Sequence, residues 1–150
     1  MALKPGSEEY LDSEKFQIRI RDWEASERTR RTLAPYITRL NEIRRAHPAL
    51  QQLRNVTIHS SDDDAILVFS KSLSTAEGVD TVIVVVNLDP HGARTSMAHL
   101  NLPALGLSWE DRFAVRDEIT GQEWEWGAHN FVHLDPYGEP AHVLSVRGRV

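Results

Sequence analysis

Acidic side chains near the start of the sequence have the residue type that glycoside chemistry requires. They lie at Glu8, Glu9, Asp12 and Glu14. Retaining cleavage of a glycosidic bond needs a carboxylic acid and a nucleophilic carboxylate held at a defined separation. A segment with so little apolar content cannot order itself, so it is either a disordered tail or a loop that other protein clamps. We therefore interpret the cluster as a solvated acidic loop and predict no catalytic residue in this chain.

Seven histidines raise the possibility of a metal site, and His129 with His133 is the most suggestive pair. If both lie on one strand they share a face, but four strand residues span about 13 Å, which is too far for one ion. The acidic run 62–64 lacks the spaced ligands of a calcium loop and instead predicts a hairpin turn. We expect no metal and no cofactor.

Trp124 and Trp126 alternate along a predicted strand and therefore share a face. Aromatic faces pack in cores and also stack on sugar rings. Packing in a core or between domains is the favoured interpretation, and an exposed carbohydrate platform remains the alternative.

The element expected to organise these side chains is the run of five apolar residues at 82–86, four of them valine. A short β-branched run that ends in the turn-forming residues 89–92 predicts a buried strand rather than a helix. Because both faces are apolar, both must be covered. Further segments with period-two patterns or β-forming composition follow at 56–60, 65–70, 95–101, 112–116, 122–126, 129–134 and 141–146. About eight strands separated by turns, with a loop at 72–80, predict a mainly β fold, an antiparallel β-sandwich.

One helix precedes these strands. Pro35 suits a first helical turn, and apolar residues recur at helical spacing up to Ile43. The helix should end at His47, because Pro48 disfavours helical geometry in the residue before it. Arg44 and Arg45 are interpreted as a solvated face that complements the helix dipole.

Composition excludes several classes of function. The chain has 150 residues, 41% of them hydrophobic, no cysteine and a formal charge of −5. This acidic balance argues against a nucleic-acid partner. No window approaches the roughly 20 apolar residues of a membrane span, and no signal-peptide pattern opens the chain. We expect a cytoplasmic protein.

Three stretches resemble one enzyme family. They are residues 5–15, residues 38–50, and residues 115–121 followed by Trp126 and Gly127. The chain resembles the C-terminal part of the alpha-1,4-glucan:maltose-1-phosphate maltosyltransferases of the alpha-amylase superfamily. The resemblance implies that residues 1–54 are an active-site loop and the last helix of an incomplete (β/α)8 catalytic barrel. It implies that residues 55–150 are the β-sandwich called domain C.

The resemblance also implies an activity. The family transfers maltosyl units from α-maltose 1-phosphate to the non-reducing end of α-1,4-glucan with retention, and its catalytic carboxylates lie upstream of this chain. The chain alone is therefore expected to be inactive, and the complete enzyme is expected to be a homodimer. Lys15 and Phe16 match a lysine–aromatic pair that contacts the donor, although the family commonly has tyrosine at the position of Phe16.

Two alternatives remain open from the sequence. The chain could come from another member of the superfamily, a trehalose synthase or an amylase-like hydrolase. It could also be a free-standing carbohydrate-binding or interaction module, which exposed and coplanar Trp124 and Trp126 would favour.

Overall fold

The computed structural model describes residues 32–149, and by its internal contacts the chain divides into two compact units, residues 1–37 and residues 38–150. Of the first unit only residues 32–37 are described. There Thr32 Oγ1 accepts a hydrogen bond of 3.1 Å from the Ala34 N–H at the start of helix α2. Lys15, Phe16 and the acidic cluster at residues 8–14 lie outside the described residues.

Helix α2 spans Ala34–Ala46, and the 3-10 helix η2 follows at Pro48–Gln51. Pro35 occupies the first turn of α2, and Arg44 and Arg45 lie in its last turn. His47 between the two helices is extended, as expected for a residue that precedes proline. The predicted end of the helix is confirmed. None of the helices among residues 32–149 has the length and apolar character needed to cross a membrane.

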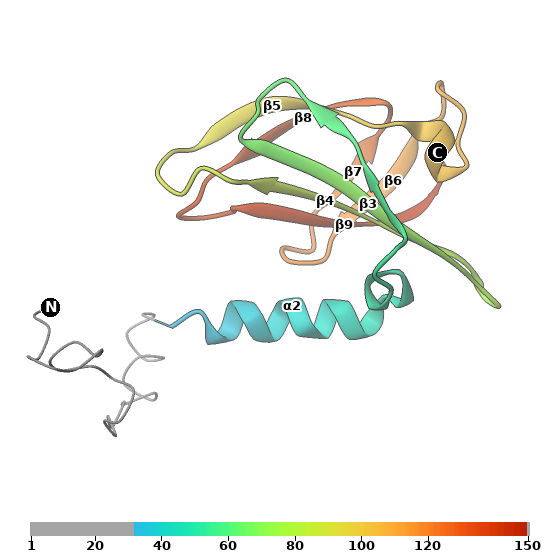
Figure 1. Ribbon diagram of the computed structural model, residues 1–150, viewed down its shortest axis with the longest axis horizontal. Helices are drawn as coiled ribbons and strands as arrows, with labels where there is room; N and C mark the ends of the chain where they lie inside the picture. Colours follow the sequence, from blue (N-terminus) through green and yellow to red (C-terminus); the bar gives the residue numbers. More distant parts are fainter. Residues whose placement is uncertain (1–31, 150) are drawn as a thin grey trace, which may run out of the picture. The chain divides into compact units, whose positions relative to one another are not determined.

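The rest of the described chain forms β-strands in two antiparallel sheets (Figure 1). The strands are β1 (Val56–Ile58), β2 (Ser60–Ser61), β3 (Ile66–Thr75), β4 (Gly78–Asn87), β5 (Arg94–His99), β6 (Phe113–Asp117), β7 (Glu123–Trp126), β8 (His129–Leu134) and β9 (Ala141–Arg149), with the 3-10 helix η3 at Leu102–Leu105. The large sheet has the order β1-β3-β4-β9-β6-β7, and the small sheet has the order β2-β5-β8. The predicted antiparallel β-sandwich is confirmed.

Strand β4 lies inside the large sheet between β3 and β9, and its two faces contribute to different clusters. Ile83 and Val85 belong to the core between the two sheets. Val82 and Val84 belong to a second cluster together with Ile43 of α2. The predicted buried strand is confirmed, and both of its apolar faces are covered.

The predicted loop at 72–80 is wrong. Strands β3 and β4 continue through it as a hairpin, paired from Ile66 with Asn87 as far as Thr75 with Gly78. Gly78 has a φ of 127°, which few other residues adopt, and Thr75 Oγ1 donates to the Gly78 carbonyl at 2.9 Å. This end of the hairpin is mostly exposed, so backbone pairing rather than burial holds it together.

The hairpin predicted from residues 56–70 is confirmed in part. Strand β1 pairs with β3, whereas β2 pairs with β5 of the other sheet. The chain changes sheets at His59, whose ring accepts a hydrogen bond at Nδ1 from the Asn101 N–H (3.0 Å) and contacts Ser70 Oγ through Nε2 (2.8 Å). Burial lowers the pKa of His59 and favours its neutral form at this corner.

Candidate functional site

The contact between helix α2 and the large sheet has an apolar centre. Ile43 is 3% exposed and packs with Val82, Val84 and Val143 on the outer face of the sheet. Partly buried side chains surround this cluster at Leu50, Phe69, Val86 and Ile119. The helix therefore covers the apolar face that the small sheet leaves open.

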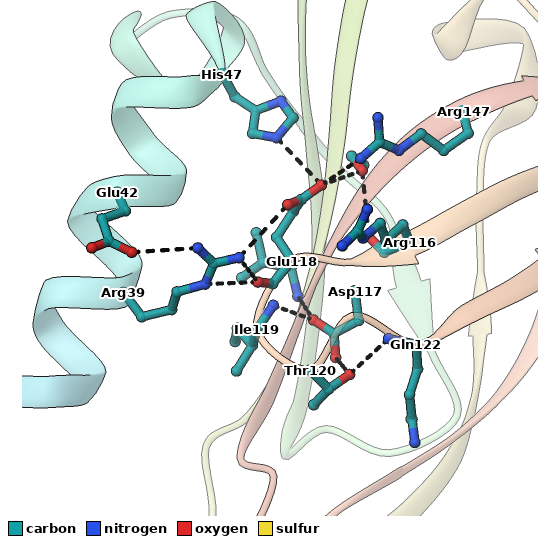
Figure 2. Close-up of polar contacts among 12 residues, drawn as sticks. Arg39, Glu42, His47, Arg116, Asp117, Glu118, Ile119, Thr120, Gln122 and Arg147 are labelled. Atoms are coloured by element: carbon teal, nitrogen blue, oxygen red, sulfur yellow. Dashed lines mark hydrogen bonds and ion pairs between the residues drawn. The ribbon is translucent and has the colours of Figure 1, made fainter.

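Arg39 of α2 reaches the turn that follows β6. Its guanidinium donates to the backbone carbonyl of Glu118 from Nε at 2.9 Å and from Nη2 at 2.5 Å, and Nη1 donates to Glu42 at 3.3 Å (Figure 2). The planar fork of an arginine suits such a paired contact. Arg39 thereby joins the helix to a residue 79 positions further along the chain.

The Glu118 carboxylate connects strand β9 with His47, the residue after helix α2. Its Oε1 accepts hydrogen bonds from Ser145 Oγ at 2.6 Å and from Arg147 Nη2 at 3.2 Å, both on strand β9. His47 Nε2 lies 3.6 Å from the same oxygen (Figure 2). Glu118 is thus held between the end of the helix and the sheet.

His47 also binds strand β4. Its Nδ1 lies 2.9 Å from Asp80 Oδ1, and Asp80 Oδ2 accepts a hydrogen bond of 2.9 Å from the Ala49 N–H. The Asp80 side chain therefore holds both the residue before η2 and a residue within it. Together with Glu118, it fixes where the helical segment ends on the sheet.

Asp117 fixes the turn that presents Glu118. It is fully buried, and it accepts hydrogen bonds from the Ile119 N–H (3.0 Å), Thr120 Oγ1 (3.2 Å) and His142 Nδ1 (3.1 Å). Burial alone would raise the pKa of Asp117, but the hydrogen bonds from His142 and the backbone outweigh burial, and the pKa of Asp117 is lowered. The Asp117 carboxylate thus ties the turn to His142 on strand β9.

This helix–sheet contact holds α2 in position on the large sheet. The residues that make it are Arg39, Ile43, His47, Asp80, Asp117 and Glu118. Its carboxylates, at Asp80, Asp117 and Glu118, all accept hydrogen bonds from other groups of the fold. Among residues 32–149, no group of three or more histidine, cysteine, aspartate or glutamate side chains is placed to hold a metal ion.

The sequence-predicted residues are distributed over the rest of the sandwich. His129 and His133 are both exposed on β8. In the strand register, His129 lies opposite His99 of β5 and His133 lies opposite Thr95. The acidic run 62–64 lies in the connection between β2 and β3, where Asp63 Oδ1 accepts from the Ala65 N–H at 2.8 Å. The predicted hairpin turn is confirmed only as a turn, because β2 and β3 belong to different sheets.

The packing interpretation of the tryptophans is confirmed. Trp126 is 6% exposed within the core, and Trp124 is half-buried against it and meets the His142 ring edge-on. The carbohydrate-platform alternative loses the exposed, coplanar pair on which it depended.

Sequence reasoning missed the helix–sheet contact. The turn itself has a local signal: residues 117–121 predict a turn, and the hydrogen bond of 2.7 Å from the Gly121 N–H to the Asp117 carbonyl confirms it. The partners of Glu118 lie on α2 and β9 and have no local signal.

The fold and this contact define the class of protein: a β-sandwich domain that anchors a helix on the outer face of its larger sheet. The family described as "GLGE, C-terminal" matches residues 58–146, which is more than half of the chain. The chain belongs to this family.

Named relatives agree with that assignment. Alpha-1,4-glucan:maltose-1-phosphate maltosyltransferase 2 of Streptomyces coelicolor is 50% identical over 145 residues, covering 97% of this chain and 21% of that protein. The maltosyltransferase of Mycolicibacterium smegmatis is 50% identical over 97% of this chain and 20% of its own length. That of Mycobacterium tuberculosis (strain H37Rv) is 48% identical with the same coverage. The chain thus spans about one fifth of the length of the curated relatives it matches.

Proposed function

We propose that this chain serves as the C-terminal β-sandwich portion of an alpha-1,4-glucan:maltose-1-phosphate maltosyltransferase. In that enzyme, maltosyl units pass from α-maltose 1-phosphate to the non-reducing end of α-1,4-glucan with retention, and the catalytic carboxylates belong to a barrel outside this chain. The alignment at 50% identity over 97% of the chain carries the proposal. A trehalose synthase or a hydrolase is less well supported, since the relatives described above are named maltosyltransferases.

Within that enzyme, we assign residues 1–54 to the end of the (β/α)8 barrel, with α2 as its last helix, and residues 55–150 to the sandwich. The anchoring of α2 by Arg39 and Ile43 supports this role. If α2 is the last helix of the barrel, holding it on the sandwich also holds the barrel next to the sandwich. A cytoplasmic location and a homodimeric assembly belong to the same proposal.

A chimera tests the proposal. This chain replaces the matching segment of the Streptomyces coelicolor relative, and phosphate release from α-maltose 1-phosphate in the presence of α-1,4-glucan is measured. We expect an active chimera, whereas the isolated chain should release phosphate only at the buffer rate, because the proposal places the two carboxylates of the retaining mechanism in a barrel outside this chain. A stable, folded chimera without activity, or turnover by the isolated chain that an acidic-residue substitution removes, would contradict the proposal.

Lys15 and Phe16 are proposed to contact the donor in the complete enzyme. A lysine ammonium would hydrogen-bond sugar hydroxyls, and losing a charged hydrogen bond costs about 1.5–3 kcal/mol. Lys15→Ala in the chimera should therefore lower kcat/KM for α-maltose 1-phosphate by roughly ten- to hundred-fold. Phe16→Tyr, which keeps the ring and adds a hydroxyl, is the matched control and should be neutral or modestly favourable. A kcat/KM for Lys15→Ala within about twofold of the parent would remove Lys15 from the donor site.

A further inference from the structure

Two histidines face each other across the small sheet. His99 of β5 and His129 of β8 are directly opposite in the strand register. Their Nδ1 atoms lie 2.7 Å apart, and the rings meet edge to face with centroids 4.9 Å apart. On the other side of its ring, His99 Nε2 lies 2.7 Å from Asp62 Oδ1. The result is a continuous chain of contacts from the carboxylate to both imidazoles.

The carboxylate determines how the two rings are protonated when they are neutral. An ionised Asp62 only accepts hydrogen bonds, so His99 Nε2 carries the hydrogen and His99 Nδ1 keeps a lone pair. His129 Nδ1 then donates its hydrogen to that lone pair. If His129 moves its hydrogen to Nε2, two nitrogen lone pairs converge on one point between the strands.

The surroundings leave that point open to solvent. The pair borders an open hollow of about 400 Å³ that is also lined by Ile58, Asn101 and Trp109, so water can reach it. His59 lines the same hollow, but both of its ring nitrogens are already engaged, by Asn101 and Ser70. The two facing imidazoles are therefore the nitrogen ligands available there.

We propose that His99 and His129 bind a first-row transition-metal ion, of the Zn²⁺, Ni²⁺ or Cu²⁺ type, through their Nδ1 atoms. Imidazole nitrogen suits these ions, and a carboxylate on the far nitrogen of a metal-binding histidine is the usual arrangement that orients it. Asp62 is the positioning residue in this site. Water completes the coordination, so the ion is exchangeable. This inference does not rest on the proposed function.

The geometry requires only a small adjustment. Two Zn–N bonds of about 2.0–2.1 Å at a tetrahedral angle place the nitrogens about 3.3 Å apart. The present separation is 2.7 Å. The shared hydrogen must therefore move to His129 Nε2, and the two rings must separate slightly and tilt so that both Nδ1 lone pairs point at the ion. Side-chain rotation on an exposed sheet face permits this movement.

Titration of the purified, tag-free 150-residue chain with ZnCl₂, and separately with NiCl₂, tests the site by calorimetry. We expect saturable binding of one ion, with Kd at least tenfold weaker in His129→Gln and in His99→Gln. Asp62→Asn should weaken binding by about 10–100-fold while both ligands remain. His133→Gln removes a histidine from the same exposed face of β8 and should leave binding unchanged.

Imidazole signals in NMR spectra provide a second readout, because the His99 and His129 rings should shift on metal addition and the His133 ring should not. Thermal unfolding of each variant verifies its fold, and the exposed position of His129 makes His129→Gln the safer variant. Absence of saturable binding up to about 1 mM metal would overturn the proposal. Binding that survives His129→Gln unchanged would overturn it equally, since the ion would then lie at other groups.

Discussion

The two faces of the large sheet are covered in different ways. On the inner face, side chains from both sheets form an apolar cluster that includes Phe113, Ile83 and Leu134, all fully buried. On the outer face, helix α2 adds one buried residue, Ile43, and the contact is completed by Arg39, Glu118 and other charged groups. The inner face is the interior of a domain, and the outer face has the composition of an interface.

This difference indicates what each contact contributes to the fold. A domain interior excludes water and derives its free energy from apolar burial, whereas contacts between domains of one chain are more polar. Directional hydrogen bonds fix an orientation that a small apolar patch alone would not fix. The outer face is therefore suited to hold a helix in one position, as the proposed role beside a catalytic barrel requires.

Phe113→Ala should have the largest effect on stability. The ring is fully buried in the inner cluster, and deleting a buried aromatic ring costs about 3–5 kcal/mol because a cavity remains. Urea unfolding followed by tryptophan fluorescence measures the change. Since domains have a total stability of roughly 5–15 kcal/mol, the variant should be barely folded at 37 °C. A loss below about 1 kcal/mol would show that the inner face is not the main source of stability.

Ile43→Ala should cost less, although Ile43 is also buried at 3% exposure. Deletion of a buried isoleucine costs about 2–5 kcal/mol, and we expect the lower half of that range because the helix can shift into the space. Hydrogen exchange should show faster exchange in residues 38–46 than in β4. If Ile43→Ala destabilised the chain as much as Phe113→Ala, the two faces would form one cooperative unit and the comparison would fail.

Asp117→Asn should cost about 1.5–3 kcal/mol at pH 7, because it removes the charge from the hydrogen bonds donated by His142, Ile119 and Thr120. The pKa of Asp117 is lowered from 3.8 in the folded chain. A lowered pKa contributes stability that is present above the ordinary value and is lost as the pH falls through the folded value. The stability difference between parent and variant should therefore shrink below pH 3.8. Urea unfolding at neutral and acidic pH measures it, and a difference that does not depend on pH would show that Asp117 acts through shape alone.

Local sequence signals predicted the elements whose structure has local causes. The β-branched run of β4 and the helix end before Pro48 follow from side-chain sterics and proline chemistry, and both are confirmed. The distal part of the β3–β4 hairpin escaped prediction because its Ser, Thr and Gly residues are mostly exposed, so no hydrophobic period marks them as strand.

The site could be predicted only in fragments. The Asp117 turn has a sequence signal, but the Arg39–Glu118 contact joins residues 79 positions apart, and no spacing rule connects them. The same limit applies to the histidines. The sequence pairs His129 with His133 because they lie four residues apart, whereas the fold places His129 opposite His99 through the register of two strands. Register is a property of the whole sheet, so a single segment does not reveal it.

Arg39→Ala should have the smallest effect on global stability and the most specific effect on the helix. Arg39 has a side-chain exposure of 44%, so solvent screens its contacts, and we expect a loss of about 0.5–1 kcal/mol. Its two bonds to the Glu118 carbonyl nevertheless set the helix orientation, so amide exchange within residues 38–46 should accelerate by roughly two- to fivefold while exchange in β4 stays constant.

Arg54→Ala, which removes an exposed arginine outside the helix, is the matched control and should change neither quantity. A decrease above about 2 kcal/mol in the free energy of unfolding would mean that the charged groups of the outer face stabilise the fold as strongly as the apolar clusters do. Unchanged exchange in the helix would mean instead that Arg39 has no part in the position of α2, which Ile43 and the His47–Asp80 contact would then hold.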